Sequence, residues 1–385
     1  MRFLDAGESH GPGMVTVVEG IPAGLAVSRS FIEGELARRR RGYGRGGRMA
    51  IEEDRVEILS GVRLGRSLGS PIALLVRNRD FQNWQEVMSP EGEGSAKTTP
   101  VTVPRPGHAD LAGAVKFSTL DIRDILERAS ARETVGRVCA GALAKLLLER
   151  VGIEVGSHVV QVGKVHAAEG RVTEPRELAE AEDDPLRCLD REASAEMVRE
   201  IDRAREEGDT LGGVVEVLAF GVPPGLGSHV HWDRRLDSRL AGALMSVQSV
   251  KGVEVGDGFA LASLRGSAAA DLIGHEEGRG FLRDTNHAGG IEGGISNGEV
   301  IRLRVAAKPI PTLGRPLKTV DLRTKERAEA LKERADICAV PAVGVVAESM
   351  VAWVLAEALL EKFGGDSMEE LETRVRAWRS QALAF

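Results

Sequence analysis

The chain has 385 residues, 42% of them hydrophobic, and carries a formal net charge of −7. That length and composition allow one large domain, or two ordinary ones, with a full hydrophobic core. The acidic balance and an aromatic content of only 4% argue against a protein whose main role is to bind nucleic acid through a basic, base-stacking surface.

The cysteine content and the lack of targeting signals point to a reducing compartment. Cys139, Cys188 and Cys338 form no C-x-x-C pair and are odd in number, so we expect neither a disulfide framework nor a zinc ribbon. No apolar run approaches about 18 residues, and the N-terminus lacks the pattern of a signal peptide. We expect a soluble, cytoplasmic protein without a bound metal.

Hydrophobic periodicity predicts the first elements of the chain. Alternating β-branched residues predict a strand over Met14–Glu19, followed by a turn over residues 20–25. Ser30 and Glu33 form a capping-box pattern, which predicts a helix running to about Arg41. The later predictions are a strand at Pro71–Val76, a long functional loop from Glu91 to Pro106, a helix over Glu133–Val151, strands at Val159–Val165 and Val214–Phe220, an apolar helix over Val345–Phe363 and an amphipathic helix over Asp366–Leu383 capped by Asp366.

A weak internal repeat indicates a duplicated unit. VVEGIPAGL (17–25) recurs as AFGVPPGL (219–226), and GSPIALLVRN (69–78) has a counterpart in GEVIRLRVAAK (298–308). Chance recurrence of short turns is the competing explanation. We predict one α+β domain over residues 1–385, with halves at roughly 1–165 and 212–345 related by a pseudo-two-fold axis. A charged, largely helical segment (169–209) would be a peripheral insertion, and residues 345–385 would form C-terminal helices.

The stretch RRRRGYGRGGRM (38–49) is the densest cluster of positive charge. It fits an RNA-binding arginine–glycine tract, and Gly42, Gly44 and Gly47 match G-x-G-x-x-G. The dinucleotide fingerprint should follow a strand and open a helix, whereas these glycines follow a predicted helix. A basic tract in an acidic chain favours a pocket for a small anion.

Four other segments place arginine or histidine in loops or at helix starts. Most of these loops are built on glycine or proline, and together they would suit a small ligand carrying phosphate and carboxylate, which arginine binds in a bidentate manner. Plainer interpretations are an exposed histidine in a turn, an ordinary helix cap and a solvated ion pair. The segments are GESHG (7–11), RPGHAD (105–110), RASARETVGR (128–137) and RADIC (334–338).

These motifs, with five others, closely resemble the chorismate synthase family and occur in the family's order over nearly the whole chain. The nine motifs are GESHG, RRRRGYGRGGRM, RPGHAD, SARETVGRV, GVPPGLG, ALMSVQSVKGVEVGDGF, NHAGGIEGGISNG, KPIPTL and RADICAVPA. The resemblance implies a β-α-β sandwich and a homotetramer. It also implies an anti-1,4-elimination that converts 5-enolpyruvylshikimate 3-phosphate to chorismate, with reduced FMN required but no net redox change.

The resemblance also implies roles for individual residues. His10 would protonate the departing phosphate, His108 would manage flavin protonation, and Asp336 would help the flavin act as a base. The implied substrate-binding residues are Arg39, Arg45, Arg48, Arg105, Arg132 and Arg334. The implied flavin contacts are Arg128, Ala129, Ser130, Gln248, Ser249, Gly293, Lys308, Pro309, Ile310, Pro311, Thr312 and Arg334.

The resemblance leaves the source of reduced flavin open. It also assigns Arg39 and Arg45 to a nicotinamide phosphate cofactor, which competes with their substrate role. No separate nicotinamide domain is recognisable, so we expect an external flavin reductase, with NADPH as the source of reducing equivalents. Asp5, where the family more often has a small polar residue, is expected to point away from the phosphate site, and His287 stands where some relatives have arginine. The alternatives are a nucleic-acid-binding protein and an inactive scaffold, and the presence of both catalytic histidines argues against the scaffold.

Overall fold

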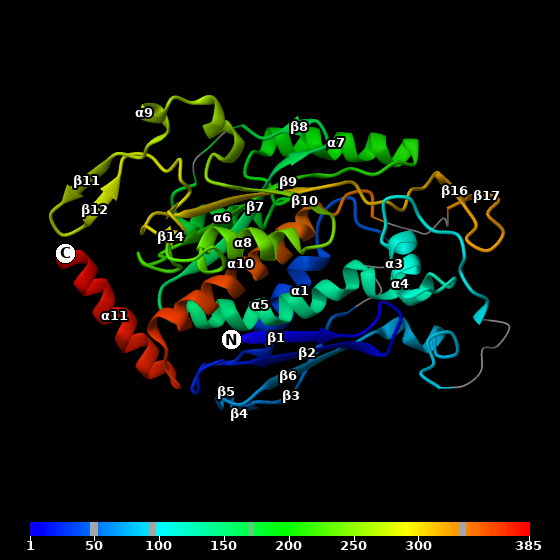
Figure 1. Cartoon of the computed structure of the whole chain (residues 1–385), viewed down its shortest axis with the longest axis horizontal. Coiled ribbons are helices and arrows are strands. Elements are labelled where there is room, and N and C mark those ends of the chain that lie inside the picture. The colour runs from blue at the N-terminus through cyan, green and yellow to red at the C-terminus, as the bar shows by residue number, and fades with distance from the viewer. Residues whose placement is uncertain (47–52, 92–97, 169, 171, 331–335) are drawn as a thin grey trace.

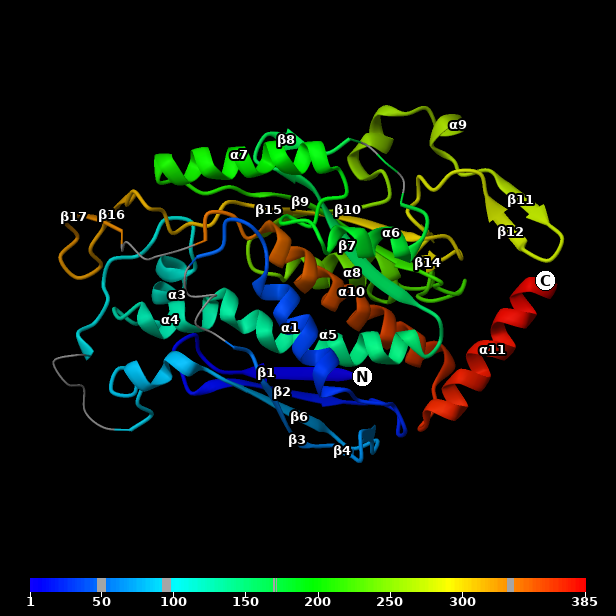
Figure 2. The same cartoon turned by 180° about the vertical axis from the view of Figure 1, so that it is seen from behind.

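The computed structural model describes residues 1–46, 53–91, 98–168, 170, 172–330 and 336–385. Two antiparallel sheets enclose a layer of helices, which gives the three-layer β-α-β sandwich seen from opposite sides in Figures 1 and 2. The helices α1 (Arg29–Arg40), α5 (Thr134–Glu149), α8 (Leu236–Met245) and α10 (Val340–Phe363) fill the middle layer. The predicted α+β class is therefore confirmed.

The first sheet has the strand order β1-β2-β6-β3, with all neighbours antiparallel. Its strands are β1 (Arg2–Ala6), β2 (Gly13–Glu19), β3 (Val56–Ser60) and β6 (Ile72–Arg77). Successive side chains of a strand point to opposite faces of the sheet. Met14 and Val18 are therefore buried against the helices, whereas Val17 is exposed.

The second sheet has the order β10-β15-β9-β7-β8. Its strands are β7 (Glu154–Val162), β8 (Val165–His166), β9 (Gly213–Phe220), β10 (Val250–Val255) and β15 (Ile301–Ala307). The single strand expected over Val159–Val165 was wrong, because the chain turns at Gly163 and divides it between β7 and β8.

The chain passes through the strands of both sheets in the same order, which is what an internal duplication predicts. Apart from β8, the order β7-β9-β15-β10 repeats β1-β2-β6-β3. The two halves also match in individual hydrogen bonds. Ser67 Oγ donates to Pro22 O (2.6 Å) and accepts from Leu25 N (2.9 Å). Ser296 Oγ makes the same pair of bonds, to Pro223 O (2.7 Å) and from Leu226 N (2.9 Å). The prolines and leucines belong to the two repeat copies found in the sequence.

The segment expected to be a peripheral insertion lies between β8 and β9, where the first half has only a short connection. It contains α6 (Pro175–Ala181) and α7 (Arg191–Glu207). Leu186, Met197 and Ile201 are fully buried members of the main hydrophobic core. The segment is therefore packed into the body of the protein.

The helix α10 is the centre of the core and packs against α5. It is long and apolar enough to cross a membrane by length and composition, but 89% of its most apolar window is buried inside the fold. Gly141 allows α5 to approach α10 closely, because a Cβ there would lie 2.3 Å from the Cβ of Ser349. The two long apolar patterns in the sequence thus form one helix pair.

Both helix starts predicted from capping residues were wrong by two residues or fewer. The N-cap of α1 is Ser28, which accepts from Phe31 N, and Glu33 instead accepts from Val56 N at 3.1 Å. The N-cap of α11 (Met368–Ala384) is Ser367, not Asp366.

The remaining elements are short and lie mostly at the two ends of the sandwich. They are β4 (Val62–Arg63), β5 (Arg66–Ser67), η1 (Arg79–Asn83), α3 (Asp110–Phe117), α4 (Arg123–Ala129), η3 (Ala131–Glu133), η4 (Trp232–Arg234), η5 (Gly258–Ser263), α9 (Gly266–Ala269), β11 (Ile273–Glu276), β12 (Gly280–Arg283), β13 (Ile291–Glu292), β14 (Ile295–Ser296), β16 (Lys318–Val320) and β17 (Arg327–Glu329).

Candidate active site

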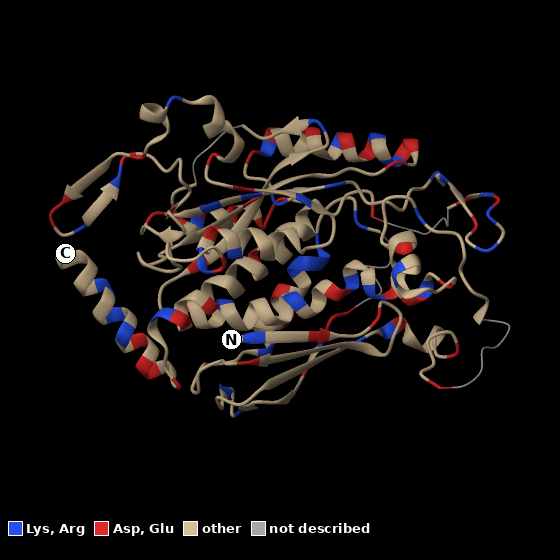
Figure 3. Ribbon diagram, viewed as in Figure 1, with Lys and Arg blue, Asp and Glu red and all other residues tan. Residues whose placement is uncertain are grey.

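The predicted site motifs come from distant parts of the sequence and meet at one end of the sandwich. This end carries α3 and α4, on the right-hand side of Figure 1. There the C-terminal end of α1, the N-terminal ends of α5 and α10, and the segments that follow β6, α8 and β15 come together. Lysine and arginine are concentrated at the end of α1, as Figure 3 shows.

His10 is held by a carboxylate and an aromatic ring. Its Nδ1 lies 2.9 and 3.0 Å from the two carboxylate oxygens of Glu127, and its backbone N–H donates to the same carboxylate at 2.9 Å. The Glu127 side chain is 2% exposed, against 17% for His10. Trp84 stacks on the imidazole with 3.9 Å between ring centroids. Burial alone would raise the pKa of Glu127, but the hydrogen bonds and charge of His10 lower it.

Asn78 ties the His10 loop to the arginines. Its Nδ2 donates to three backbone carbonyls of that loop, including Gly11 O at 2.7 Å, and its Oδ1 accepts from Arg132 Nε at 2.8 Å. A second link runs from Ser130 Oγ to Ser9 Oγ at 3.1 Å. The two motifs predicted from sequence to serve one site are thus joined directly.

Arg39 and Arg132, both buried, and the largely buried Arg45 form a cluster, hereafter the arginine cluster. Arg132 NH1 and Arg39 NH2 bind opposite oxygens of Asp54 at 2.6 and 3.2 Å, and the Asp54 side chain is fully buried. Burial and the nearby charges of Arg132 and Arg45 lower the pKa of the Arg39 guanidinium to about 10, despite the opposing effect of Asp54. Arg39 Nε and Arg45 Nε are buried without hydrogen-bond partners among the described residues. The cluster is therefore positively charged and presents donors to a ligand.

Asp336 fixes the arginine-rich segment from the other side. It accepts from Gly46 N at 2.6 Å and lies 3.3 Å from Arg45 NH1. Ile337 N donates to Gly44 O at 2.7 Å, so the segments before α10 and after α1 are paired. Two further predicted substrate residues, Arg48 and Arg334, lie outside the described residues.

The RPGHAD loop forms a compact ionic unit around buried Asp110. Arg105 donates from Nε to Asp110 at 2.9 Å, and His108 Nδ1 binds the other oxygen of the carboxylate. Burial opposes ionisation of Asp110, but the hydrogen bonds from His108 and Arg105 hold its pKa well below the usual range. Arg105 NH1 also reaches Thr312 Oγ1 at 3.5 Å.

Predicted flavin contacts in the segment 308–312 adjoin this loop. Lys308 donates to Gly107 O through Nζ, and its backbone N donates to Ser249 O at 2.9 Å. Gln248 Nε2 donates to Glu133 Oε2 at 2.6 Å, while Gln248 Oε1 is buried without a partner among the described residues. The contacts connect the two predicted flavin segments, at 248–249 and 308–312. Ala129 ends α4, and Pro309, Ile310 and Pro311 continue from Lys308.

Arg128 is engaged within the protein by Asp5. It binds the Asp5 carboxylate and donates to Gly7 O at 3.0 Å. Burial and the adjacent Glu133 carboxylate raise the pKa of Asp5 to about 6, although Arg128 opposes the rise. Asp5 Oδ2 is buried and receives no hydrogen bond from the described part of the chain. Asp5 thus faces a predicted flavin contact.

Gly293 is the one described residue of the predicted set that is not brought to this end. It lies in the turn between β13 and β14, where Gly294 O accepts from Leu236 N at 2.9 Å. Leu236 begins α8 and Gln248 follows its end. Since α8 is ten residues long, it separates Gly293 from Gln248 by about 15 Å.

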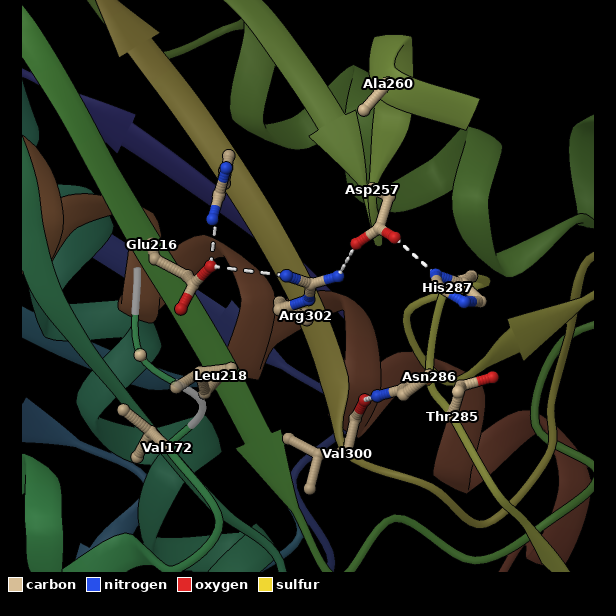
Figure 4. Close-up of a pocket in the computed structure, with 12 residues that line it drawn as sticks. Val172, Glu216, Leu218, Asp257, Ala260, Thr285, Asn286, His287, Val300 and Arg302 are labelled. Carbon is tan, nitrogen blue, oxygen red and sulfur yellow. Dashed lines mark hydrogen bonds and ion pairs between the residues drawn. The ribbon is translucent and has the colours of Figure 1, made fainter. Parts of the chain in front are cut away.

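A separate hollow of about 450 Å³ lies on the outer face of the second sheet. Figure 4 shows its charged side chains paired with one another: Arg302 with Asp257 and Glu216, and His287 with Asp257 at 2.5 Å. None of the predicted site residues lines it. His287, noted from the sequence as a departure, belongs to this hollow.

A second hollow, of about 690 Å³, opens beside the arginine cluster through Asp54 and Arg40. Most of its charged side chains are paired with one another: Arg55 and Arg79 with Glu53, and Arg77 with Glu57. The arginines are Arg29, Arg40, Arg55, Arg77 and Arg79, and the carboxylates are Glu33, Glu53, Asp54 and Glu57.

Sequence reasoning missed four residues that organise the site: Asp54, Asn78, Trp84 and Glu127. Asp54 and Glu127 lie in ordinary charged stretches, and their partners are far away in sequence; Glu127 is 117 residues from His10. Trp84 is one of only four tryptophans and follows the predicted strand that ends near Val76. The rarity of tryptophan in this chain was the one feature of the sequence that could have pointed to a role for Trp84.

Comparison with known proteins identifies the same family throughout. The family model described as chorismate synthase matches residues 1–360. The chain is 57% identical to chorismate synthase of Moorella thermoacetica over 379 residues, covering 98% of each chain. It is 54% identical to that of Aquifex aeolicus, covering 100% of this chain and 99% of the relative. A crystal structure of chorismate synthase superimposes with a TM-score of 0.81 at 44% identity, covering 100% of this chain and 98% of the other.

Proposed function

The chain belongs to the chorismate synthase family, and we propose that the site around His10 and the arginine cluster is its catalytic centre. The enzyme is a lyase of the shikimate pathway that feeds aromatic amino acid biosynthesis. It eliminates phosphate from 5-enolpyruvylshikimate 3-phosphate and gives chorismate without net oxidation or reduction.

The arginine cluster is the observation that carries the assignment. Three guanidinium groups, those of Arg39, Arg45 and Arg132, share Asp54 and Asp336, and burial together with their mutual repulsion already lowers the pKa of Arg39. A ligand with a phosphate and two carboxylates would neutralise this charge and engage Arg39 Nε and Arg45 Nε, which have no partner among the described residues. The substrate has that charge pattern. Arg105 and, by family resemblance, Arg48 and Arg334 complete the proposed set.

His10 is suited to protonate the departing phosphate. Glu127 binds Nδ1, and we assign the delivery of a proton to Nε2. The adjacent Ser9–Ser130 and Asn78 contacts fix the loop in front of Arg132. The phosphate would thus meet an acid and a cation at the same place, which stabilises negative charge on the leaving group.

The residues present also fit a bound flavin. Gln248 Oε1 is a buried acceptor without a partner in the described structure, and Lys308 supplies positive charge beside the RPGHAD loop. These residues would hold FMN together with Ser130, Ser249 and Thr312, and His108 would lie near it. When bound, reduced FMN supplies transient electron density that helps expel the phosphate and is then recovered.

The remaining features of the proposal are reduced flavin from an external reductase that uses NADPH, a homotetrameric assembly and a cytoplasmic location. Buried free cysteines suit a reducing compartment. The nucleic-acid interpretation loses support, because Arg38 and Arg39 of the tract point into the protein and not toward a surface groove.

The decisive test is an anaerobic assay with 5-enolpyruvylshikimate 3-phosphate and photoreduced FMN, following chorismate absorbance and phosphate release. Parallel samples contain oxidised FMN alone and oxidised FMN with NADPH, and product in the last would show intrinsic flavin reduction. His10→Ala should lower kcat by roughly 10²–10⁴-fold. His231→Ala is the matched control, because His231 is an exposed histidine paired with Asp233. Full activity of His10→Ala would remove His10 from the chemistry.

A further inference from the structure

We infer that Glu127 is a positioning residue that orients His10 for proton delivery, with Trp84 packed against the face of the imidazole. The inference rests on the proposed role of His10 and extends it to two residues to which neither the family motifs nor the comparisons assign a role.

The geometry is that of a carboxylate–histidine dyad. Glu127 contacts His10 at two atoms, Nδ1 and the backbone N, so it fixes both the ring and its loop. The side chain comes from α4, and a third bond joins α4 to the same loop, because Ser9 N donates to Glu127 O at 2.9 Å. A carboxylate that accepts from Nδ1 selects one tautomer and favours the imidazolium form.

Trp84 restricts the ring from its face. The stacking distance of 3.9 Å and the 27° interplanar angle leave little room for the imidazole to turn. The indole is itself fixed, because its Nε1 donates to Asp80 Oδ2 at 3.0 Å. The stack therefore acts together with Glu127 to hold Nε2 in one direction.

Among the described residues, Arg123 is a further charged group that contacts Glu127. Its guanidinium lies 3.3 Å from Glu127 Oε1 and 5.3 Å from the centroid of the Trp84 ring. It competes with His10 for the carboxylate and keeps Glu127 ionised when His10 loses its proton. Such an arrangement lets His10 release a proton to the phosphate while its orientation is retained.

The test compares Glu127→Gln with Glu127→Asp in the full-length enzyme. Glu127→Gln retains the shape but removes the charge, so kcat should fall by roughly 10–100-fold with little change in KM. The alkaline limb of its kcat–pH profile should move to lower pH by about one unit. Glu127→Asp keeps the charge, so its limb should stay close to that of the parent. The matched control is Glu216→Gln, which removes a buried carboxylate 3.2 Å from His158 Nε2, away from the site.

A second readout does not depend on turnover or flavin. Diethyl pyrocarbonate modifies neutral imidazole, and mass spectrometry of the His10 peptide gives its rate of modification at each pH. In Glu127→Gln that rate should reach its plateau at lower pH than in the parent.

The outcomes separate the inference from the proposed function. If Glu127→Gln is folded and leaves both pH profiles unchanged, the inference is overturned even when kcat has fallen, since Glu127 would then be only a structural support. Unchanged kcat in Glu127→Gln with an inactive His10→Ala overturns the inference alone. An active His10→Ala overturns the proposed role of His10 as well. If Glu127→Gln does not fold, the kcat–pH profile of Glu127→Asp is the test. An alkaline limb close to that of the parent supports the inference, and a limb moved to lower pH overturns it.

Discussion

Glu348 in the middle of α10 offers a sharp test of how the core is held together. Its carboxylate is completely buried and accepts hydrogen bonds from Arg38, Lys145, Arg187 and Ser157, the last three at 2.6 Å. Two further carboxylates, Glu35 and Glu182, complete the network. Three cations therefore balance three anions, and Glu348→Gln leaves one buried positive charge uncompensated.

The expected cost of Glu348→Gln follows from that imbalance. Removing one partner of a buried ion pair destabilises a protein by about 3–5 kcal/mol, because the remaining charge stays desolvated. We expect a loss in this range, since Glu348 contacts all three cations. Burial opposes ionisation of Glu348, but Arg38, Lys145 and Arg187 hold its pKa well below the ordinary value of 4.5. Its contribution to stability is therefore complete above pH 4.5 and is lost as the pH falls through the lowered pKa.

Urea unfolding followed by circular dichroism measures this loss. Between pH 6 and 8 the difference between the parent and Glu348→Gln should be constant, and below pH 4.5 it should shrink. Glu196→Gln is the control: it breaks an exposed pair with Arg199 and should leave the urea midpoint unchanged. A loss below about 1 kcal/mol at pH 7, or a difference that stays constant to pH 3, would refute the reasoning.

Two other predictions concern packing and the Asp5 carboxyl. Gly141→Ala should destabilise by about 3 kcal/mol or more, because the new Cβ would lie 2.3 Å from Ser349 Cβ. Gly34→Ala, in the open on α1, should instead stabilise by about 0.5–1 kcal/mol; equal effects in urea unfolding would contradict the close helix approach. Because the pKa of Asp5 is raised to about 6, the parent loses stability as Asp5 ionises. The urea midpoint of Asp5→Asn should therefore rise relative to the parent between pH 4 and 7, and a pH-independent difference would show that Asp5 is not shifted.

Local signals in the sequence predicted individual strands and helices, whereas their arrangement in layers was implied by the family resemblance. The alternation at Met14–Glu19 and the apolar run of α10 can each be recognised from residues that are close together in the sequence. The first residue of α1 was harder to predict, because Ser28 and Ser30 are both plausible N-caps within one turn. Which of them caps the helix depends on how α1 packs against the core.

The arginine tract shows where local signals fail. Adjacent positions on a helix point about 100° apart, so Arg38 enters the ionic network of Glu348 while Arg39 enters the arginine cluster. The two residues are chemically identical, and only the helix phase separates a structural arginine from a site arginine. Likewise Glu127 looked like any helix-surface carboxylate, because its partner in the His10 loop is brought to it by tertiary structure alone.

The matching strand order of the two sheets helps to explain why one end of the sandwich gathers so many distant residues. Equivalent positions of the two halves converge there: the ends of α1 and α8, the ends of β6 and β15, and the starts of α5 and α10. Each pair has diverged in chemistry. The end of α1 supplies arginines, whereas the end of α8 supplies Gln248 and Ser249; the segment after β6 supplies Asn78, whereas the segment after β15 supplies Lys308. The site therefore has two unlike sides, one dense in fixed positive charge and one with a buried amide acceptor. Two different anionic ligands, a phosphorylated substrate and a flavin, require that asymmetry if they are to lie side by side in a defined order.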